Sequence, residues 1–231
     1  EARGREVVEE IEREGSGSAR FYQADLASLE EVRRLAEQIR ADHDRLDLLV
    51  NNAGIWLTEG ARQLSTDGYE LHFHVNYLAG YLLTHELLPL LEQSSAPRIV
   101  NVASGAQTPI DFDDVHLERD YSGSRAYAQS KLAQILFTID LAEQTASRGI
   151  VVTSLHPATY MATDMVREAG ITPRSTVDEG AVAVMNLIDS PEVESGSYYS
   201  GQRQTRPNAQ ALDPEARRQL RELSERLVEV N

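Results

Sequence analysis

Three short apolar runs place the strongest constraint on how this chain folds. Residues 46–50, 98–103 and 150–155 are each predominantly apolar over the length of one strand, and a helical pattern follows each run. A strand that is apolar on both faces has to be covered on both faces, as happens in parallel sheets flanked by helices. The alternation of such strands with helices predicts an α/β fold with a doubly wound, three-layer parallel sheet.

The remaining elements follow from local patterns. Ser28 and Glu31 form a capping-box pattern that begins a helix, and residues 15–18 are expected to end the helix before it. Periodicity predicts the other elements: helices at 1–14, 67–92, 124–147, 177–188 and 214–230, and short strands at 19–24 and 197–200. With 231 residues and no internal repeat, the chain is expected to form a single domain, 1–231.

Charge and composition exclude several classes of protein. Lys and Arg number 22 against 37 Asp and Glu, which gives a net charge of −15. Such a surface repels phosphate, so we expect no nucleic-acid partner and no binding to anionic membranes. There is no Cys, hence no disulfide or thiolate metal site. No apolar run reaches the ~18 residues of a membrane span, and no signal peptide is recognisable, so a cytoplasmic location is predicted.

Tyr127 and Lys131 are the strongest candidates for chemistry. They lie four residues apart on one predicted helix and therefore share a face. A free Tyr titrates near ~10, and a neighbouring ammonium group lowers that pKa toward neutrality. Lys131 is the only Lys in a chain whose other basic residues are all Arg. The alternative is a chance pairing on a helix surface, which we regard as the weaker interpretation.

Three further candidates carry polar side chains: two of them follow predicted strands, and the third lies within a predicted helix. Ser104 follows the 98–103 strand and can either polarise a substrate oxygen or cap a turn. Residues 51–54, Asn-Asn-Ala-Gly, follow the 46–50 strand and form either a ligand-binding loop or a simple turn. Asn76 lies within a predicted helix, where Asn is unfavourable unless solvated or held by a partner.

Other kinds of site find little support. Ser104 lacks the Gly-x-Ser-x-Gly context of a hydrolase nucleophile. His72 and His74 are two residues apart on a predicted helix and so point in different directions. The acidic residues at 111–114 do not have calcium-loop spacing and are interpreted as a solvated loop. We therefore predict no metal site.

Together, the motifs resemble the short-chain dehydrogenase/reductase family. Asn-Asn-Ala-Gly at 51–54, Ser104 after its strand, and Tyr-Ala-Gln-Ser-Lys at 127–131 occur in the family's order, and the resemblance covers essentially the whole chain. The 22 residues between Ser104 and Tyr127, and Ser-Lys-Leu-Ala-Gln-Ile-Leu-Phe-Thr at 130–138, resemble its retinol-dehydrogenase-like branch. The resemblance implies a Rossmann-like sheet and hydride exchange between an alcohol or carbonyl and NAD or NADP, with NADP favoured. The branch points to lipophilic alcohols or carbonyls.

The same resemblance assigns roles to residues. Tyr127 would be the acid–base, Lys131 would hold the cofactor ribose and tune Tyr127, Ser104 would polarise the carbonyl, and Asn76 would support a water relay. The implied cofactor contacts are Asp25 and Leu26 at the adenine, then Asn52, Ala53, Gly54, Tyr127, Lys131, Pro157, Ala158 and Thr163, with Ala158 standing where the family usually has Gly. Pairing of the 67–92 and 124–147 helices across a two-fold axis would give a homodimer or homotetramer.

One family feature is absent from these residues. A dinucleotide-binding fold has a Gly-rich turn between its first strand and helix, and the glycines at 15 and 17 instead precede a predicted strand. We expect two further strands with that turn to precede Glu1, lying between the 19–24 and 46–50 strands of the sheet. The alternative is a non-catalytic remnant or scaffold of the same fold that cannot bind cofactor.

Overall fold

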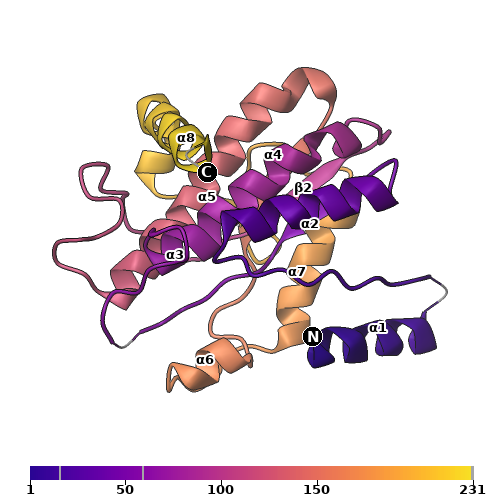
Figure 1. Cartoon of the computed structure of the whole chain (residues 1–231), viewed down its shortest axis with the longest axis horizontal. Coiled ribbons are helices and arrows are strands. Elements are labelled where there is room, and N and C mark those ends of the chain that lie inside the picture. Colours follow the sequence, from indigo (N-terminus) through magenta and orange to yellow (C-terminus); the bar gives the residue numbers. More distant parts are fainter. Residues whose placement is uncertain (16, 59, 230–231) are drawn as a thin grey trace.

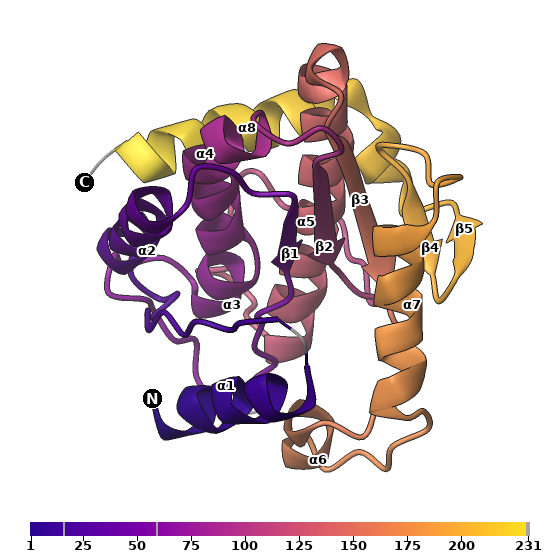
Figure 2. The same cartoon turned by 90° about the vertical axis from the view of Figure 1, so that its right-hand side faces the viewer.

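The computed structural model describes residues 1–15, 17–58 and 60–229. The described residues form a five-stranded sheet in the order β1-β2-β3-β4-β5, with helices on both faces (Figures 1 and 2). The strands are β1 Leu48–Asn51, β2 Arg98–Val102, β3 Val151–His156, β4 Tyr198–Ser200 and β5 Arg203–Thr205. Strands β1 to β4 pair in parallel, as predicted, and β5 is antiparallel to β4.

Helices alternate with the strands along the chain. Their bounds are α1 Ala2–Glu14, α2 Leu29–Asp42, α3 Leu71–Phe73, α4 Ala79–Leu91, α5 Gly123–Thr145, α6 Asp164–Glu168, α7 Val177–Asp189 and α8 Pro214–Glu229. A π-helical turn at His74–Leu78 joins α3 to α4, and 3₁₀ turns lie at Ala146–Arg148 and Ala209–Leu212. The sequence analysis did not predict β5, α6 or the π-helical turn. Ser16 and Val230, which it placed at element ends, lie outside the described residues.

The two faces of the sheet carry separate cores because side chains alternate along each strand. Ile99 of β2 and Val152 of β3 belong to the larger core with α2, α4, α5 and α8. Val100 and Leu155 point the other way and pack with Ala183 and Leu187 of α7. This arrangement confirms the three-layer, doubly wound architecture.

The predicted strand at 19–24 is wrong. This segment is extended but has no strand partner among the described residues, because β1 is the last strand at that side of the sheet. Its side chains bind elsewhere: the Phe21 ring lies against Gly4 of α1, and the Tyr22 hydroxyl donates a 2.9 Å hydrogen bond to Asp42 at the end of α2. Asp25, which comes directly after this segment, therefore does not follow a strand.

The first apolar run is less buried than expected. All four residues of β1 are half-buried, whereas β2 and β3 are buried along most of their length. Among the described residues β1 has a strand on one side only, which leaves part of its apolar surface uncovered. The helix predicted at 67–92 begins later, at Leu71, because residues 65–68 form a turn closed by a bond from Gly68 N to Ser65 O and Glu70 forms a β-bridge with Leu64.

The C-terminal helix α8 lies across α5 and completes the larger core (Figure 2). Arg221 donates to Asp140 at 2.6 Å and Arg217 donates to Glu143 at 2.8 Å, both from α8 to α5. The Tyr77 and Ser224 hydroxyls are 2.6 Å apart and both buried. The apolar residues of α4 and α5 are therefore covered largely by α2 and α8 of the same chain.

The start of α5 touches the loop that follows β1. A Cβ atom on Gly123 would lie 1.8 Å from the Leu57 carbonyl oxygen. We therefore expect Gly123→Ala to lower the free energy of unfolding by about 1–3 kcal/mol, the usual cost of overpacking. Urea denaturation measures this. Gly17→Ala is the control, since its Cβ would meet nothing within 4 Å; equal midpoints for the two variants would contradict the prediction.

Candidate active site

The four predicted catalytic residues come together at the carboxyl end of the sheet. Lys131 Nζ of α5 lies 5.8 Å from the centre of the Tyr127 ring and donates to the Val102 carbonyl at the end of β2. Asn76 donates to the Ser130 hydroxyl of the same helix at 2.9 Å. Ser104 follows β2 and hydrogen-bonds to Tyr127 through its side chain. Residues from the end of β2, the π-helical turn and α5 thus share one small region.

Tyr127 is a protonated phenol in this environment. Burial raises the pKa of Tyr127, and the hydrogen bond from Ser104 opposes that shift only in part. The expectation that Lys131 lowers the pKa of Tyr127 is therefore not met. In its described hydrogen bonds the ammonium binds the Val102 carbonyl and Gln134, and burial is the largest influence on the pKa of Tyr127. A neutral phenol next to a hydroxyl is suited to donate a proton to a developing oxyanion.

Lys131 is the most desolvated cation near the site. Its side chain is only 4% exposed, and burial lowers its pKa to about 7. Its ammonium donates to Val102 O and to Gln134 Oε1, each at 2.9 Å. Neither partner carries a charge, so the fold keeps a cation in an apolar region with neutral oxygens alone.

Asn76 is buried and clamps the loop after β1. It is 2% exposed and lies in the π-helical turn. Its Oδ1 accepts from Ile55 N at 2.7 Å, and its Nδ2 donates to Ile55 O at 3.0 Å as well as to Ser130. A π-helical turn inside an α-helix often marks a functional position. The solvated interpretation of Asn76 is wrong, because every polar atom of its amide has a protein partner.

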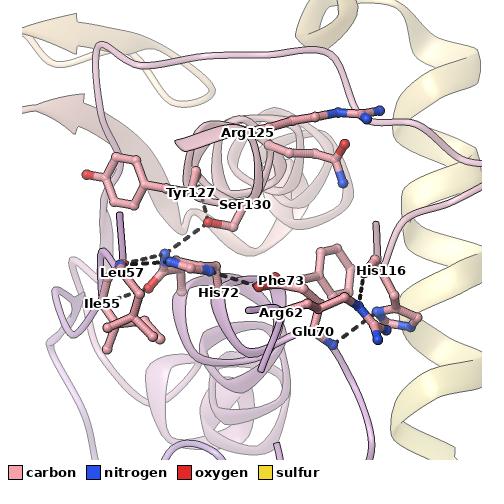
Figure 3. A network of polar contacts seen from close by, with 12 residues as sticks. Ile55, Leu57, Arg62, Glu70, His72, Phe73, His116, Arg125, Tyr127 and Ser130 are labelled. Carbon is pink, nitrogen blue, oxygen red and sulfur yellow. Dashed lines mark hydrogen bonds and ion pairs between the residues drawn. The ribbon is translucent and has the colours of Figure 1, made fainter. Parts of the chain in front are cut away.

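A second clamp on the same loop escaped the sequence analysis. His72 Nε2 accepts from Leu57 N at 3.0 Å, and its Nδ1 pairs with the buried Glu70 carboxylate at 2.8 Å (Figure 3). The other Glu70 oxygen accepts from Phe73 N at 2.7 Å. Because Leu57 N can only donate, Nδ1 carries the His72 proton. The signal in the sequence is an acidic residue two positions before a His, at the start of an apolar helix. This pattern predicts no role until the position of the loop after β1 is known.

An aromatic surface covers Tyr127. The Trp56 and Tyr127 rings are 5.4 Å apart, and Tyr160 stacks on Trp56 at 6.5 Å with an interplanar angle of 8°. Tyr160 adopts a positive φ of 48°, and Arg174 lies 5.5 Å from its ring. Trp56 Nε1 is buried without a hydrogen-bond partner. These residues were not predicted, since no local pattern joins position 56 to position 160.

The residues present fit the ribose and nicotinamide half of a dinucleotide. A Cβ on Gly54 would lie 3.2 Å from Lys131 Nζ and 3.1 Å from Asn76 Oδ1, so only Gly leaves this space open. Asn52 and Ala53 are exposed beside it. Lys131 can donate to ribose hydroxyls, and the backbone at Gly54 can be approached closely.

The other predicted cofactor residues occupy two places. Pro157 and Ala158 follow β3 directly, and Thr163 precedes α6, so all three lie past the carboxyl end of a strand. Asp25 and Leu26 precede α2, where Asp25 Oδ1 accepts from Ala27 N at 2.9 Å and closes a turn. No described contact joins Asp25 or Leu26 to Tyr127 or Lys131, and their adenine role stays a prediction.

The described residues contain neither a metal-ligand cluster nor a membrane-spanning helix. Within 1–15, 17–58 and 60–229, no group of three or more His, Cys, Asp or Glu is arranged to hold a metal ion. No helix in the described part of the chain is both long and apolar enough to cross a membrane.

Comparison with known proteins agrees with this geometry. Residues 1–173 match the family model described as short chain dehydrogenase. Human retinol dehydrogenase 13 is 37% identical over 230 residues, covering 88% of this chain and 67% of the relative. Mouse polyprenol dehydrogenase is 38% identical over 241 residues, covering 95% of this chain and 71% of the relative.

Solved structures share the fold. An uncharacterised protein from Mycobacterium paratuberculosis superposes with a TM-score of 0.77 at 28% identity, covering 98% of this chain and 81% of that one. An NADPH-bound carbonyl reductase from chicken fatty liver has a TM-score of 0.64 at 23% identity, covering 86% and 79%. From the family match, the retinol and polyprenol dehydrogenase relatives and the shared site motifs, the chain belongs to the short-chain dehydrogenase family, in its retinol-dehydrogenase-like branch.

Proposed function

We propose that this protein is an NAD(P)-dependent oxidoreductase that interconverts an alcohol and a carbonyl, with Tyr127 as the acid–base. The observation that carries the proposal is Lys131, a cation 4% exposed with only neutral partners, held one helical turn from Tyr127. Burying a charge this way destabilises a fold. An apolar residue would pack there more favourably, so a role in chemistry explains the Lys better than a structural role does.

The bound nicotinamide would accept or donate the hydride at the carbinol carbon. In the direction of reduction, Tyr127 gives its phenol proton to the carbonyl oxygen as that oxygen gains negative charge. In the direction of oxidation the Tyr127 oxygen takes the proton from the alcohol. The Ser104 hydroxyl can donate to the same substrate oxygen. Lys131 stabilises the phenolate that remains after proton donation.

The substrate is proposed to be lipophilic, and NADP is favoured over NAD on the branch resemblance. Support for a lipophilic substrate comes from relatives whose names state activity on retinol and polyprenol, and from the aromatic surface of Trp56 and Tyr160 beside Tyr127. An apolar substrate would pack against those rings without leaving their faces solvated. The alternative, a non-catalytic protein of this fold, is separated by the assays that follow.

Tyr127→Phe removes the proton donor and little volume. In the full-length protein we expect kcat to fall by ~10²–10⁴-fold, as for other general acid–base residues, with dinucleotide affinity nearly unchanged. Turnover of retinal and of small aldehydes with NADPH and NADH measures the first, and calorimetry the second. Tyr22→Phe removes an exposed hydroxyl far along the sequence and should leave both unchanged. Near-native turnover by Tyr127→Phe would disprove the assignment.

Lys131→Met should stabilise the fold while abolishing activity. The pKa of Lys131 is lowered from 10.5 to about 7, so between these values the unfolded chain binds a proton that the folded chain lacks. The contribution of Lys131 to the free energy of unfolding therefore rises with pH between about 7 and 10.5. Below that range the folded protein bears the full cost of burying the charged ammonium. The variant should melt at a higher temperature than the wild type below pH 7, with the gain vanishing above pH ~10.5. A lower melting temperature at pH 6 would contradict the prediction.

The oligomeric state and the location stay predictions. A homodimer or homotetramer is supported by the family resemblance alone, because most apolar side chains of α4 and α5 are already covered within one chain and add no support of their own. Light scattering of the full-length protein at micromolar concentration should give twice or four times the chain mass, and a monomeric mass would refute it. The cytoplasmic location rests on the sequence alone.

A further inference from the structure

In its described hydrogen bonds, the Lys131 ammonium donates to two oxygen atoms. One is the main-chain carbonyl of Val102, which any residue at that position would supply. The other is the side-chain oxygen of Gln134, 2.9 Å from Nζ and three residues further along α5. Gln134 is itself only 4% exposed, so water does not compete for this bond.

Among residues 1–15, 17–58 and 60–229, no charged side chain influences the Lys131 ammonium. From α5 the titratable neighbour is Tyr127, whose pKa is raised by burial and which is therefore neutral. From the π-helical turn and the loop after β1 the neighbours are Asn76 and Gly54, both uncharged. From β2 only the Val102 carbonyl reaches it. Among the described hydrogen bonds of Lys131, the Gln134 amide is therefore the only side chain that favours the charged ammonium over the neutral amine.

Gln134 is anchored by a polar chain that crosses the larger core. Its main-chain carbonyl accepts from the Thr138 hydroxyl at 2.8 Å, and that hydroxyl accepts from Asn101 Nδ2 at 2.9 Å. Asn101 Oδ1 in turn accepts from Asn51 Nδ2 at 2.8 Å. These bonds fix this turn of α5 against β2 and β1, and so fix the distance from the Gln134 side chain to the end of β2.

We propose that Gln134 is a positioning residue that holds the Lys131 ammonium in place and keeps it protonated beside Tyr127. This inference rests on the proposed function, in which Lys131 stabilises the Tyr127 phenolate that remains after proton donation. A neutral amide oxygen stabilises the ammonium without cancelling its charge, so the field of that charge still reaches the phenol. A carboxylate at 134 would instead neutralise the cation, and an apolar residue would leave it unsupported.

The test uses the single lysine of this sequence. Full-length protein labelled with ¹³Cε-lysine gives a Lys131 signal, assigned by its loss in Lys131→Met, whose shift against pH reports the Lys131 pKa without any enzymatic assay. Gln134→Leu should lower that pKa by about one pH unit or more below the wild type, because a hydrogen bond to the charged form is lost. Gln134→Glu should raise it by at least as much.

Gln129→Leu is the matched control. Gln129 lies on the same helix, is 2% exposed and bonds to Val115 O and Asp111 N, away from the ammonium. The Gln129→Leu substitution should destabilise the fold without changing the Lys131 pKa. If Gln134→Leu leaves the pKa where Gln129→Leu leaves it, the inference is overturned. Should Gln134→Leu fail to fold, an unchanged pKa in the near-isosteric Gln134→Glu overturns it instead.

Activity adds a second readout. In Gln134→Leu the ammonium loses its proton at lower pH, so kcat should fall ~10-fold near pH 8 and recover toward the wild type as the pH is lowered. Gln134→Glu should shift the same limb of the profile to higher pH. If no variant is an oxidoreductase, the proposed function fails on the Tyr127 assay, while the Lys131 titration still decides whether Gln134 holds the ammonium. An unaltered profile in both variants would show that Gln134 has no influence on the reaction.

Discussion

Helix α5 is buried along almost its whole length, and the arrangement of the site depends on that burial. The sheet covers one side of the helix, and α8 with the α3–α4 segment covers much of the rest (Figure 2). A helix enclosed in this way cannot leave its polar side chains in water, so Gln129, Ser130, Lys131, Gln134 and Thr138 all have to find partners inside the protein. Their partners lie on β2, in the π-helical turn, in the loop before α5 and on α5 itself.

This requirement joins packing to chemistry. Ser130 donates to the Tyr127 carbonyl within the helix and accepts from Asn76 outside it, while Thr138 connects α5 to Asn101 of β2. Each bond satisfies a buried polar atom and also fixes α5 against the sheet. These bonds therefore fix the positions of Tyr127 and Lys131 as closely as hydrogen-bond geometry requires. Proton transfer needs positioning of the same precision.

The loop after β1 is also held by buried polar side chains, which in this case come from α3 and the π-helical turn. Asn76 and His72 both bond to its backbone, at Ile55 and Leu57, and Glu70 holds His72 in one tautomer. Gly123 at the start of α5 leaves room for the Leu57 carbonyl. The loop carries Gly54 and Trp56, so its clamps define both the space beside Lys131 and the aromatic wall over Tyr127.

By itself the sequence determined the three-layer architecture and the strands β2 and β3. It also determined the choice of Tyr127, Lys131, Ser104 and Asn76 as candidate site residues, because periodicity and motif spacing are local properties. Only the tertiary structure decided which polar residues meet. The Glu70–His72 clamp, the stacking of Trp56 on Tyr160 and the bond from Lys131 to an amide all depend on which surfaces are brought together when the sheet and helices pack. The segment 19–24 shows the same limit: its pattern suits a strand, but a strand exists only where a neighbour supplies the other half of its hydrogen bonds.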